Sequence, residues 1–453
     1  MSARVSALGP AFALALGAVL PSAALGQAMD TFGMGSRSTS MGGAVTADVA
    51  DFSANFYNPA GLVRSDELRI AIGYMGTHSQ MYVNDLDSSI DPVRGIVSGF
   101  VVPGRFGEVE FAFGLGVHLN DQRVSRSRTL PRTTPRWELY DNRPHRTFLA
   151  AHLALRPVDW LLVGGGMAFQ AISSTTLALR GTLDVPSPAG ASELEHDLVG
   201  NLETLRYPQV GIQIVPNGRV SFGAVYRGEY RLENVLEAEG LAGLTGVSEV
   251  PPDLYVLIHS ESVNAFAPQQ LSFGASVQPV DGVTLNAELT WVDWSDYQTS
   301  IGAADVVLTL DVPPELMDFI EVPDSINSTR PIQPGFTDRW VPRVGAEIRA
   351  IDTGALELDV RCGYFYESTP IPNQSGPYNL VDTDRHAFSL GAGLRLTDLE
   401  PTVRGFLAID IHFQYSILPE RVIVKQSLVD TFGDYRAHGH IFAAGMTTEV
   451  GFE

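Results

Sequence analysis

Residues 283–291 read Val-Thr-Leu-Asn-Ala-Glu-Leu-Thr-Trp, and their apolar and polar side chains alternate strictly. Successive side chains of a β-strand point to opposite faces, so Leu285 and Leu289 share one face while Asn286 and Glu288 share the other. A helix would instead repeat its apolar residues every three or four positions. The stretch therefore predicts a strand with one apolar and one polar face.

The same alternation recurs at 356–366, 388–396 and 407–417. The polar faces carry too many charged residues for the dry core of a soluble protein, since such residues are rarely buried without partners. Segments of this length cross a bilayer when they are tilted, and the Tyr and Trp residues near their ends are typical of interfacial girdles. The pattern favours membrane-spanning strands whose apolar side faces lipid.

The lengths of the connections support a closed barrel. We expect fourteen strands, at 68–77, 95–103, 108–119, 146–156, 160–180, 204–215, 219–233, 270–279, 283–298, 339–350, 354–366, 385–397, 404–418 and 437–452. Connections after even-numbered strands are tight and rich in Gly and Asn, whereas those after odd-numbered strands are long. Bacterial outer-membrane barrels sort their connections in this way. Residues 67–453 are therefore predicted to form an all-β, fourteen-stranded antiparallel transmembrane β-barrel with long extracellular loops.

The first 26 residues have the layout of a cleaved signal peptide. Arg4 is their only charge, 11–20 form a short apolar core, and small residues follow. The apolar core is too short to span a bilayer as a helix, and no later apolar run approaches the length that a transmembrane helix needs. An exported chain of alternating strands is expected in the outer membrane of a Gram-negative bacterium.

Composition and motifs exclude several functions. A net charge of −22 argues against nucleic acid, and the single cysteine, Cys362, excludes a disulfide framework or a cysteine-based zinc site. Motifs of serine hydrolases, phosphate loops and zinc proteases are absent from the sequence. Asp410 and His412 share a face, but Ser416 would lie roughly 13 Å from His412 along the strand. We expect no enzyme activity, cofactor or metal.

Residues 27–66 do not alternate. Four apolar residues within this segment recur at helical spacing and are candidate contacts: Val45, Val49, Phe52 and Phe56. They predict one short amphipathic helix that ends at Pro59. Such a segment needs an enclosed apolar site, and the interior of the barrel is the nearest one. Residues 27–66 are therefore expected to form an N-terminal plug.

Three motifs carry a family resemblance. Residues 33–44 and 51–62, which include Asn58, Pro59, Ala60 and Gly61, resemble the N-terminal hatch of the FadL/TodX family of outer-membrane transporters. Residues 289–297 resemble the family's Asp-Trp-Ser strand, and 361–370 resemble a third family segment. The resemblance implies a hatch-plugged, monomeric barrel. It also implies passive uptake of long-chain fatty acids or aromatic hydrocarbons.

The polar faces place charged side chains inside the predicted barrel. The candidate lumen charges are Arg227, Arg231, Glu288, Arg343, Arg361, Arg395 and Asp410. We expect them to pair with one another and to anchor the plug; a narrower interpretation gives one arginine the carboxylate head of a ligand. The expected partners are a hydrophobic small molecule, outer-membrane lipid and lipopolysaccharide. Two alternatives remain: a structural or secretion-associated barrel without small-molecule transport, and a soluble exported β-protein or an enzyme.

Overall fold

A computed structural model describes residues 28–122, 134–141, 147–184, 193–245, 253–297, 303–311, 325–327, 333–373, 379–397, 399, 404–425 and 433–452. Among them, no helix is long and apolar enough to cross a membrane. Side chains of 170–205, 231–265 and 298–332 are not described. The predicted signal peptide lies outside the described residues.

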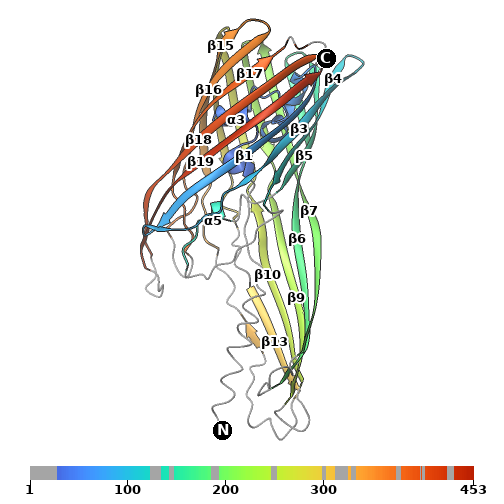
Figure 1. Cartoon of the computed structure of the whole chain (residues 1–453), viewed down its shortest axis with the longest axis vertical. Helices are drawn as coiled ribbons and strands as arrows, with labels where there is room; N and C mark the ends of the chain where they lie inside the picture. Colours follow the sequence, from blue (N-terminus) through green and yellow to red (C-terminus); the bar gives the residue numbers. More distant parts are fainter. Residues whose placement is uncertain are drawn as a thin grey trace.

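Fourteen antiparallel strands form a closed barrel (Figure 1). They are β1 (Leu68–Val83), β3 (Arg94–Phe106), β4 (Val109–Asn120), β5 (Phe148–Val158), β6 (Leu161–Asp184), β7 (Glu193–Asn217), β8 (Val220–Arg227), β11 (Gln270–Val280), β12 (Val283–Val292), β15 (Arg339–Asp352), β16 (Leu356–Glu367), β17 (Arg385–Leu396), β18 (Gly405–Ile423) and β19 (Tyr435–Phe452). The first strand pairs with the last from Leu68 and Phe452 to Val83 and Ala437, which closes the ring. The predicted fold class is confirmed.

The wall is apolar outside and polar inside, the reverse of a soluble protein. On β18, Ile411 and Phe413 are 51 % and 47 % exposed, whereas His412 and Gln414 between them are 8 % and 3 % exposed. Cys362 on β16 is also exposed on the outer surface. Where the side chains of the wall are described, such alternation gives an apolar outer surface suited to lipid and a polar lining of the lumen.

The connections are sorted by length at the two ends of the barrel. Tight turns at 107–108, 159–160, 218–219, 281–282 and 353–355 join strands at one end. Gly107 and Gly282 occupy positive φ angles of 62° and 79° there, which suit glycine. The described parts of the long connections, such as 134–141, 293–297 and 333–338, lie at the other end. This arrangement confirms the predicted alternation of turns and loops.

A sheet arm extends beyond the barrel (Figure 1). The far ends of β6 and β7 continue into it and are joined by β9 (Tyr230–Thr245), β10 (Asp253–Ala267), β13 (Ala303–Asp311) and β14 (Ser325–Asn327). The predicted strands 160–180 and 204–215 were too short, because the ladder between β6 and β7 persists to Thr182 and Glu193. Predicted strand 219–233 merged β8 with the start of β9. Predicted strand 283–298 was too long, because β12 ends at Val292.

The remaining elements are short. They are β2 (Leu86–Asp87), α2 (Ala28–Phe32), α3 (Ser36–Ser40), α4 (Ala54–Tyr57), the 3₁₀ helix η2 (Pro59–Arg64) and α5 (Glu138–Asp141). We call residues 28–65 the N-terminal segment. It contacts strands around the ring, with η2 against β4 to β7 and α3 against β16 to β19. Figure 1 shows the helices of this segment, in blue, inside the barrel and enclosed by its strands.

Candidate functional site

The Asn-Pro-Ala-Gly motif fastens the N-terminal segment to the wall. Asn58 Oδ1 accepts a hydrogen bond from the Ala60 backbone N–H at 3.1 Å, which caps η2, and Pro59 occupies the first turn. Asn58 Nδ2 donates to the carbonyl of Thr46 at 2.8 Å and to that of Ile212 on β7 at 3.1 Å. One side chain therefore closes a turn, joins two parts of the segment and binds a wall strand.

Inward-facing glycines let the backbone of the segment approach the wall. A Cβ on Gly211 would lie 2.0 Å from Asn58 Oδ1, and a Cβ on Gly61 would lie 2.1 Å from the Val49 carbonyl oxygen. Neither distance is possible for a real side chain. The wall glycines that face the segment are Gly99, Gly114, Gly116, Gly164, Gly211, Gly223, Gly274, Gly345, Gly363 and Gly391. The lumen is thus shaped to hold this segment closely.

The four apolar candidates are buried, but the predicted helix is wrong. The exposed fractions of Val45, Val49, Phe52 and Phe56 are 0 %, 0 %, 2 % and 5 %. Only α4 is helical among 45–56, and turns occupy the rest. An amphipathic helix needs one solvent-facing side, whereas this segment is surrounded by wall on every side. Its apolar residues therefore contact different strands, as Phe52 does where it packs under Gly99.

One charged cluster joins α3 to three wall strands. Arg361 pairs with Glu347 at 2.5 Å and also with Asp410. Arg37 of α3 pairs with Glu347 at 3.1 Å and with Asp48 at 3.1 Å. Burial favours pairing, because an unpaired buried charge is costly. The structure thus brings Arg361 and Asp410 together with the segment.

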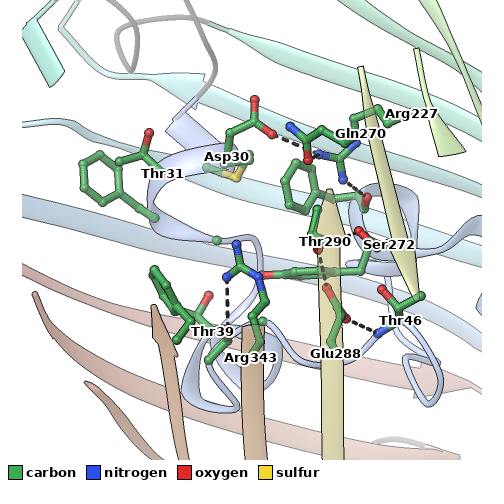
Figure 2. A pocket seen from close by; sticks show the side chains of 18 of the residues that line it. Asp30, Thr31, Thr39, Thr46, Arg227, Gln270, Ser272, Glu288, Thr290 and Arg343 are labelled. Carbon is green, nitrogen blue, oxygen red and sulfur yellow. Dashed lines mark hydrogen bonds and ion pairs between the residues drawn. The ribbon is translucent and has the colours of Figure 1, made fainter. Parts of the chain in front are cut away.

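A second group of charges surrounds α2 and the neighbouring turns (Figure 2). Arg227 pairs with Asp30 at 2.9 Å and donates to the Phe56 carbonyl at 2.6 Å. Glu288 accepts from the Thr46 N–H at 3.0 Å. Separately, Arg343 donates to the Gly42 carbonyl at 3.2 Å.

Two predicted lumen charges remain, Arg395 and Arg231, and only the side chain of Arg395 is described. Arg395 stacks 3.7 Å from the centre of the Phe406 ring and pairs with Glu67 at 3.8 Å, just beyond the N-terminal segment. Its side chain is 34 % exposed. The expectation that Arg395 anchors the segment directly is therefore wrong, because its contacts are with the barrel end. The side chain of Arg231 lies outside the described residues.

Two cavities lie beside α2. The first contains Arg227, Glu288 and Tyr57 in its lining (Figure 2). The second extends to Leu139 and Tyr140 of α5. Asp30, Thr31, Gln270, Thr290 and Arg343 line both. The α2 helix therefore stands where the two cavities meet.

Sequence reasoning missed several lining residues of the second cavity. They are Arg339, Glu367 and Arg385, together with Leu139 and Tyr140 of α5. Glu367 lay within the family segment 361–370, but alternation alone does not tell how far a side chain reaches across a lumen. The α5 helix belongs to a long connection, for which the sequence carried no periodic signal.

Aromatic residues pack together near α5. Trp294, Tyr297 and Phe336 pack together, with ring centres of Tyr297 and Phe336 4.1 Å apart. All three are less than 5 % exposed. In the neighbouring connection, burial raises the pKa of the Asp382 carboxyl to about 6. Packed side chains are thus buried at the end of the barrel that has the long connections.

A closed barrel with an apolar exterior, sorted connections and a lumen occupied by its own N-terminal segment defines the class of bacterial outer-membrane channels. The chain belongs to the family described as outer membrane protein transport protein (OMPP1/FadL/TodX), whose model matches residues 14–450. The resemblance inferred from the motifs is therefore confirmed.

Individual relatives are distant in sequence. Alkane uptake protein A of Marinobacter nauticus is 21 % identical over 425 residues, covering 87 % of this chain and 85 % of that protein. A FadL homologue of Pseudomonas aeruginosa has a TM-score of 0.59 at 17 % identity, with 96 % and 99 % of the two chains covered. The toluene transporter TodX of P. putida has a TM-score of 0.51 at 15 % identity, with 93 % and 99 % covered. These structures support the fold.

Proposed function

We propose that the protein mediates passive uptake of hydrophobic small molecules, long-chain fatty acids or hydrocarbons, across the outer membrane. The observation that carries the proposal is the pair of cavities beside α2 inside a closed barrel. A polar pore filled with water would not attract such solutes, whereas burial of each CH₂ group gains about 0.8 kcal/mol. Family membership and the alkane-uptake relative support the same function.

In this proposal, residues 1–26 are a signal peptide that is removed, 27–66 act as the hatch, and 67–453 form the conducting barrel. The hatch would block water and ions at rest. Its α2 helix has only five residues and contacts the wall through Arg227 and Arg385, which donates to the Thr31 carbonyl at 2.9 Å. Movement of α2 would connect the two cavities.

The proposed surroundings of the barrel follow from its surface. The exposed apolar side chains of the wall would contact outer-membrane lipid, and the acidic long connections would meet lipopolysaccharide through divalent cations. The barrel closes on itself through β1 and β19, so a single chain makes a complete wall. We therefore propose that it acts as a monomer and that it transports its cargo without chemical conversion.

Native mass spectrometry of the purified protein, followed by extraction of the bound small molecules, tests the proposal. We expect a fatty acid or hydrocarbon at up to one or two molecules per barrel. Gentle exchange into a short-chain detergent, with no apolar ligand added, serves as the control for detergent occupancy. A barrel that carries a stoichiometric protein partner and no apolar ligand would contradict uptake and favour a secretion-associated role.

A further inference from the structure

Histidines gather on one sector of the outer surface of the barrel. His438 and His440 on β19 lie on the same outer face as Met446, which is 51 % exposed. His386 on β17 shares its outer face with Phe388, which is 48 % exposed. Both strands begin at the end of the barrel that has the long connections. The three histidines therefore lie at the extracellular border of the lipid-facing surface.

Each of these histidines lies beside a tyrosine of a neighbouring strand. The phenol oxygen of Tyr415 on β18 is 2.8 Å from His440 Nδ1, and the two rings stack with their centres 5.7 Å apart. The phenol oxygen of Tyr364 on β16 is 2.9 Å from His386 Nδ1. The rings of a third pair stack at 5.2 Å. We call the three pairs the Tyr–His belt: Tyr82 with His438, Tyr364 with His386, and Tyr415 with His440.

The Tyr–His belt crosses five consecutive strands, β16, β17, β18, β19 and β1 (Figure 1). It includes the seam between the first strand and the last, where Tyr82 and His438 are opposite each other. His78 on β1 is exposed in the same sector. Strands β8, β11, β12 and β15 contain no histidine, and Trp291 is opposite Trp340 there. Among the described lipid-facing positions, histidine thus occurs in this sector alone.

The donor chemistry of the Tyr–His belt differs from that of an ordinary aromatic girdle. Trp and Tyr are the usual girdle residues, because their rings combine an apolar body with a polar tip. A phenol that donates to Nδ1 leaves the imidazole proton on Nε2, and that N–H group can donate to a further acceptor. In the opposite sector, Trp291 Nε1 donates to Asp338 at 3.2 Å within the protein. The Tyr–His belt therefore has N–H groups for an acceptor outside the chain.

A permanent cation adjoins the Tyr–His belt. Arg436 lies two residues before His438, on the same face of β19, and its side chain is 51 % exposed. Its pairs with Asp85 at 3.1 Å and with Glu420 at 3.8 Å are both exposed, and such pairs are weak. Arg436 is therefore available to a more highly charged acceptor. Guanidinium and imidazole donors in one row suit a phosphate group, which accepts several charge-assisted hydrogen bonds.

We propose that the Tyr–His belt binds the phosphorylated headgroup of lipid A, the membrane anchor of lipopolysaccharide in the outer leaflet. The phosphate accepts hydrogen bonds from His438, His440 and Arg436. The acyl chains lie against the apolar wall below, which includes Phe413 and Met446. Because the lipid spans the seam between β1 and β19, its binding stabilises the closed ring. The site needs no divalent cation and does not depend on what the barrel transports.

Native mass spectrometry of the purified full chain tests the proposal. The chain is titrated with lipid A and with the same lipid after removal of its phosphates, and EDTA is present so that cations on the acidic connections do not bridge. We expect lipid A to bind at least about tenfold more tightly, since hydrogen bonds to a charged group are worth more than neutral ones. Equal binding of the two lipids would overturn the proposal. A preference seen only without EDTA would overturn it as well, because cations would then carry the binding.

Two double variants separate the Tyr–His belt from a general girdle effect. His438→Phe with His440→Phe keeps two rings and removes their N–H groups, so we expect the preference for lipid A to disappear while the dephosphorylated lipid binds as before. Trp291→Phe with Trp340→Phe removes two N–H groups from the opposite sector and is the matched control, which should keep the preference. Lipid A should also raise the unfolding temperature of the wild type and not that of the histidine variant.

Heat-modifiable migration in gels verifies that each variant barrel is folded. A preference that persists in the folded histidine variant, or that falls equally in the tryptophan variant, would show that the histidines do not hold the headgroup, and the proposal would fail.

Discussion

Replacing Asn58 by alanine isolates the attachment of the N-terminal segment to the wall. The substitution deletes the bond to the Ala60 N–H and both donated bonds, to the carbonyls of Thr46 and Ile212. The Thr46 carbonyl still accepts a hydrogen bond from Gln213 Nε2 at 3.1 Å. Loss of the Asn58 bond therefore costs more at the Ile212 carbonyl than at the Thr46 carbonyl. With about 1 kcal/mol per net bond, and more for a buried group left unpaired, the loss is about 2–4 kcal/mol.

That free energy changes the population of the undocked segment, not the stability of the barrel ladder. At about 1.4 kcal/mol per tenfold, undocking should become about 30- to 700-fold more frequent. Hydrogen exchange of amides in 44–64 should accelerate by that factor, and planar bilayers should show more frequent conductance events. Asn217→Ala is the matched control, since Asn217 makes an exposed turn bond to the Arg219 N–H at 2.9 Å. Unchanged amide protection in the Asn58 variant would refute the reasoning.

Three further changes probe other parts of the account. Gly363→Ala puts a Cβ 2.1 Å from the segment backbone; single-channel recording should show a leak in this variant and none in the lipid-facing control Cys362→Ala. Arg361→Gln removes the arginine that pairs with Asp410 and one of the two arginines that pair with Glu347, so it should lower the free energy of unfolding by about 3–5 kcal/mol in urea titrations. Burial raises the pKa of the Asp382 carboxyl to about 6, so the protonated carboxyl stabilises the folded state of its connection. This stabilisation is complete below about pH 4 and is lost as the pH rises through about 6. Proteolysis at pH 5 and 8 should differ for the wild type and agree for Asp382→Asn; an equal pH effect in both would contradict this.

The strands were predictable because alternation is a local property of the sequence. Residues such as Ile411 and His412 reveal their faces without knowledge of any neighbour, so all fourteen strand positions follow from period two. The strand ends were less predictable. Alternation continues in β6 and β7 beyond the barrel, and only pairing with β9 shows that they extend into the arm. The assumption that each strand is only long enough to cross a bilayer therefore placed the ends of β6 and β7 wrongly.

The N-terminal segment was harder to predict, for a physical reason. Val45 and Val49 have helical spacing, but that rule assumes one buried and one exposed face. Inside a barrel every face of the segment is buried. Its backbone N–H and C=O groups therefore find hydrogen-bond partners in the wall and in side chains such as that of Asn58. Similarly, Arg343 was recognised as a lumen charge, whereas its convergence with Arg339 and Arg385 depends on curvature that a sequence does not display.

The most direct test of uptake is the initial rate at which cells accumulate radiolabelled oleate and hexadecane. The host is a Gram-negative strain without its own outer-membrane route for these compounds, and it carries either the full chain or an empty vector. We predict a faster initial rate with the chain for at least one compound, with uptake of a hydrophilic sugar unchanged. Rates equal to the vector control for both compounds, with folded protein present in the outer membrane, would contradict the account.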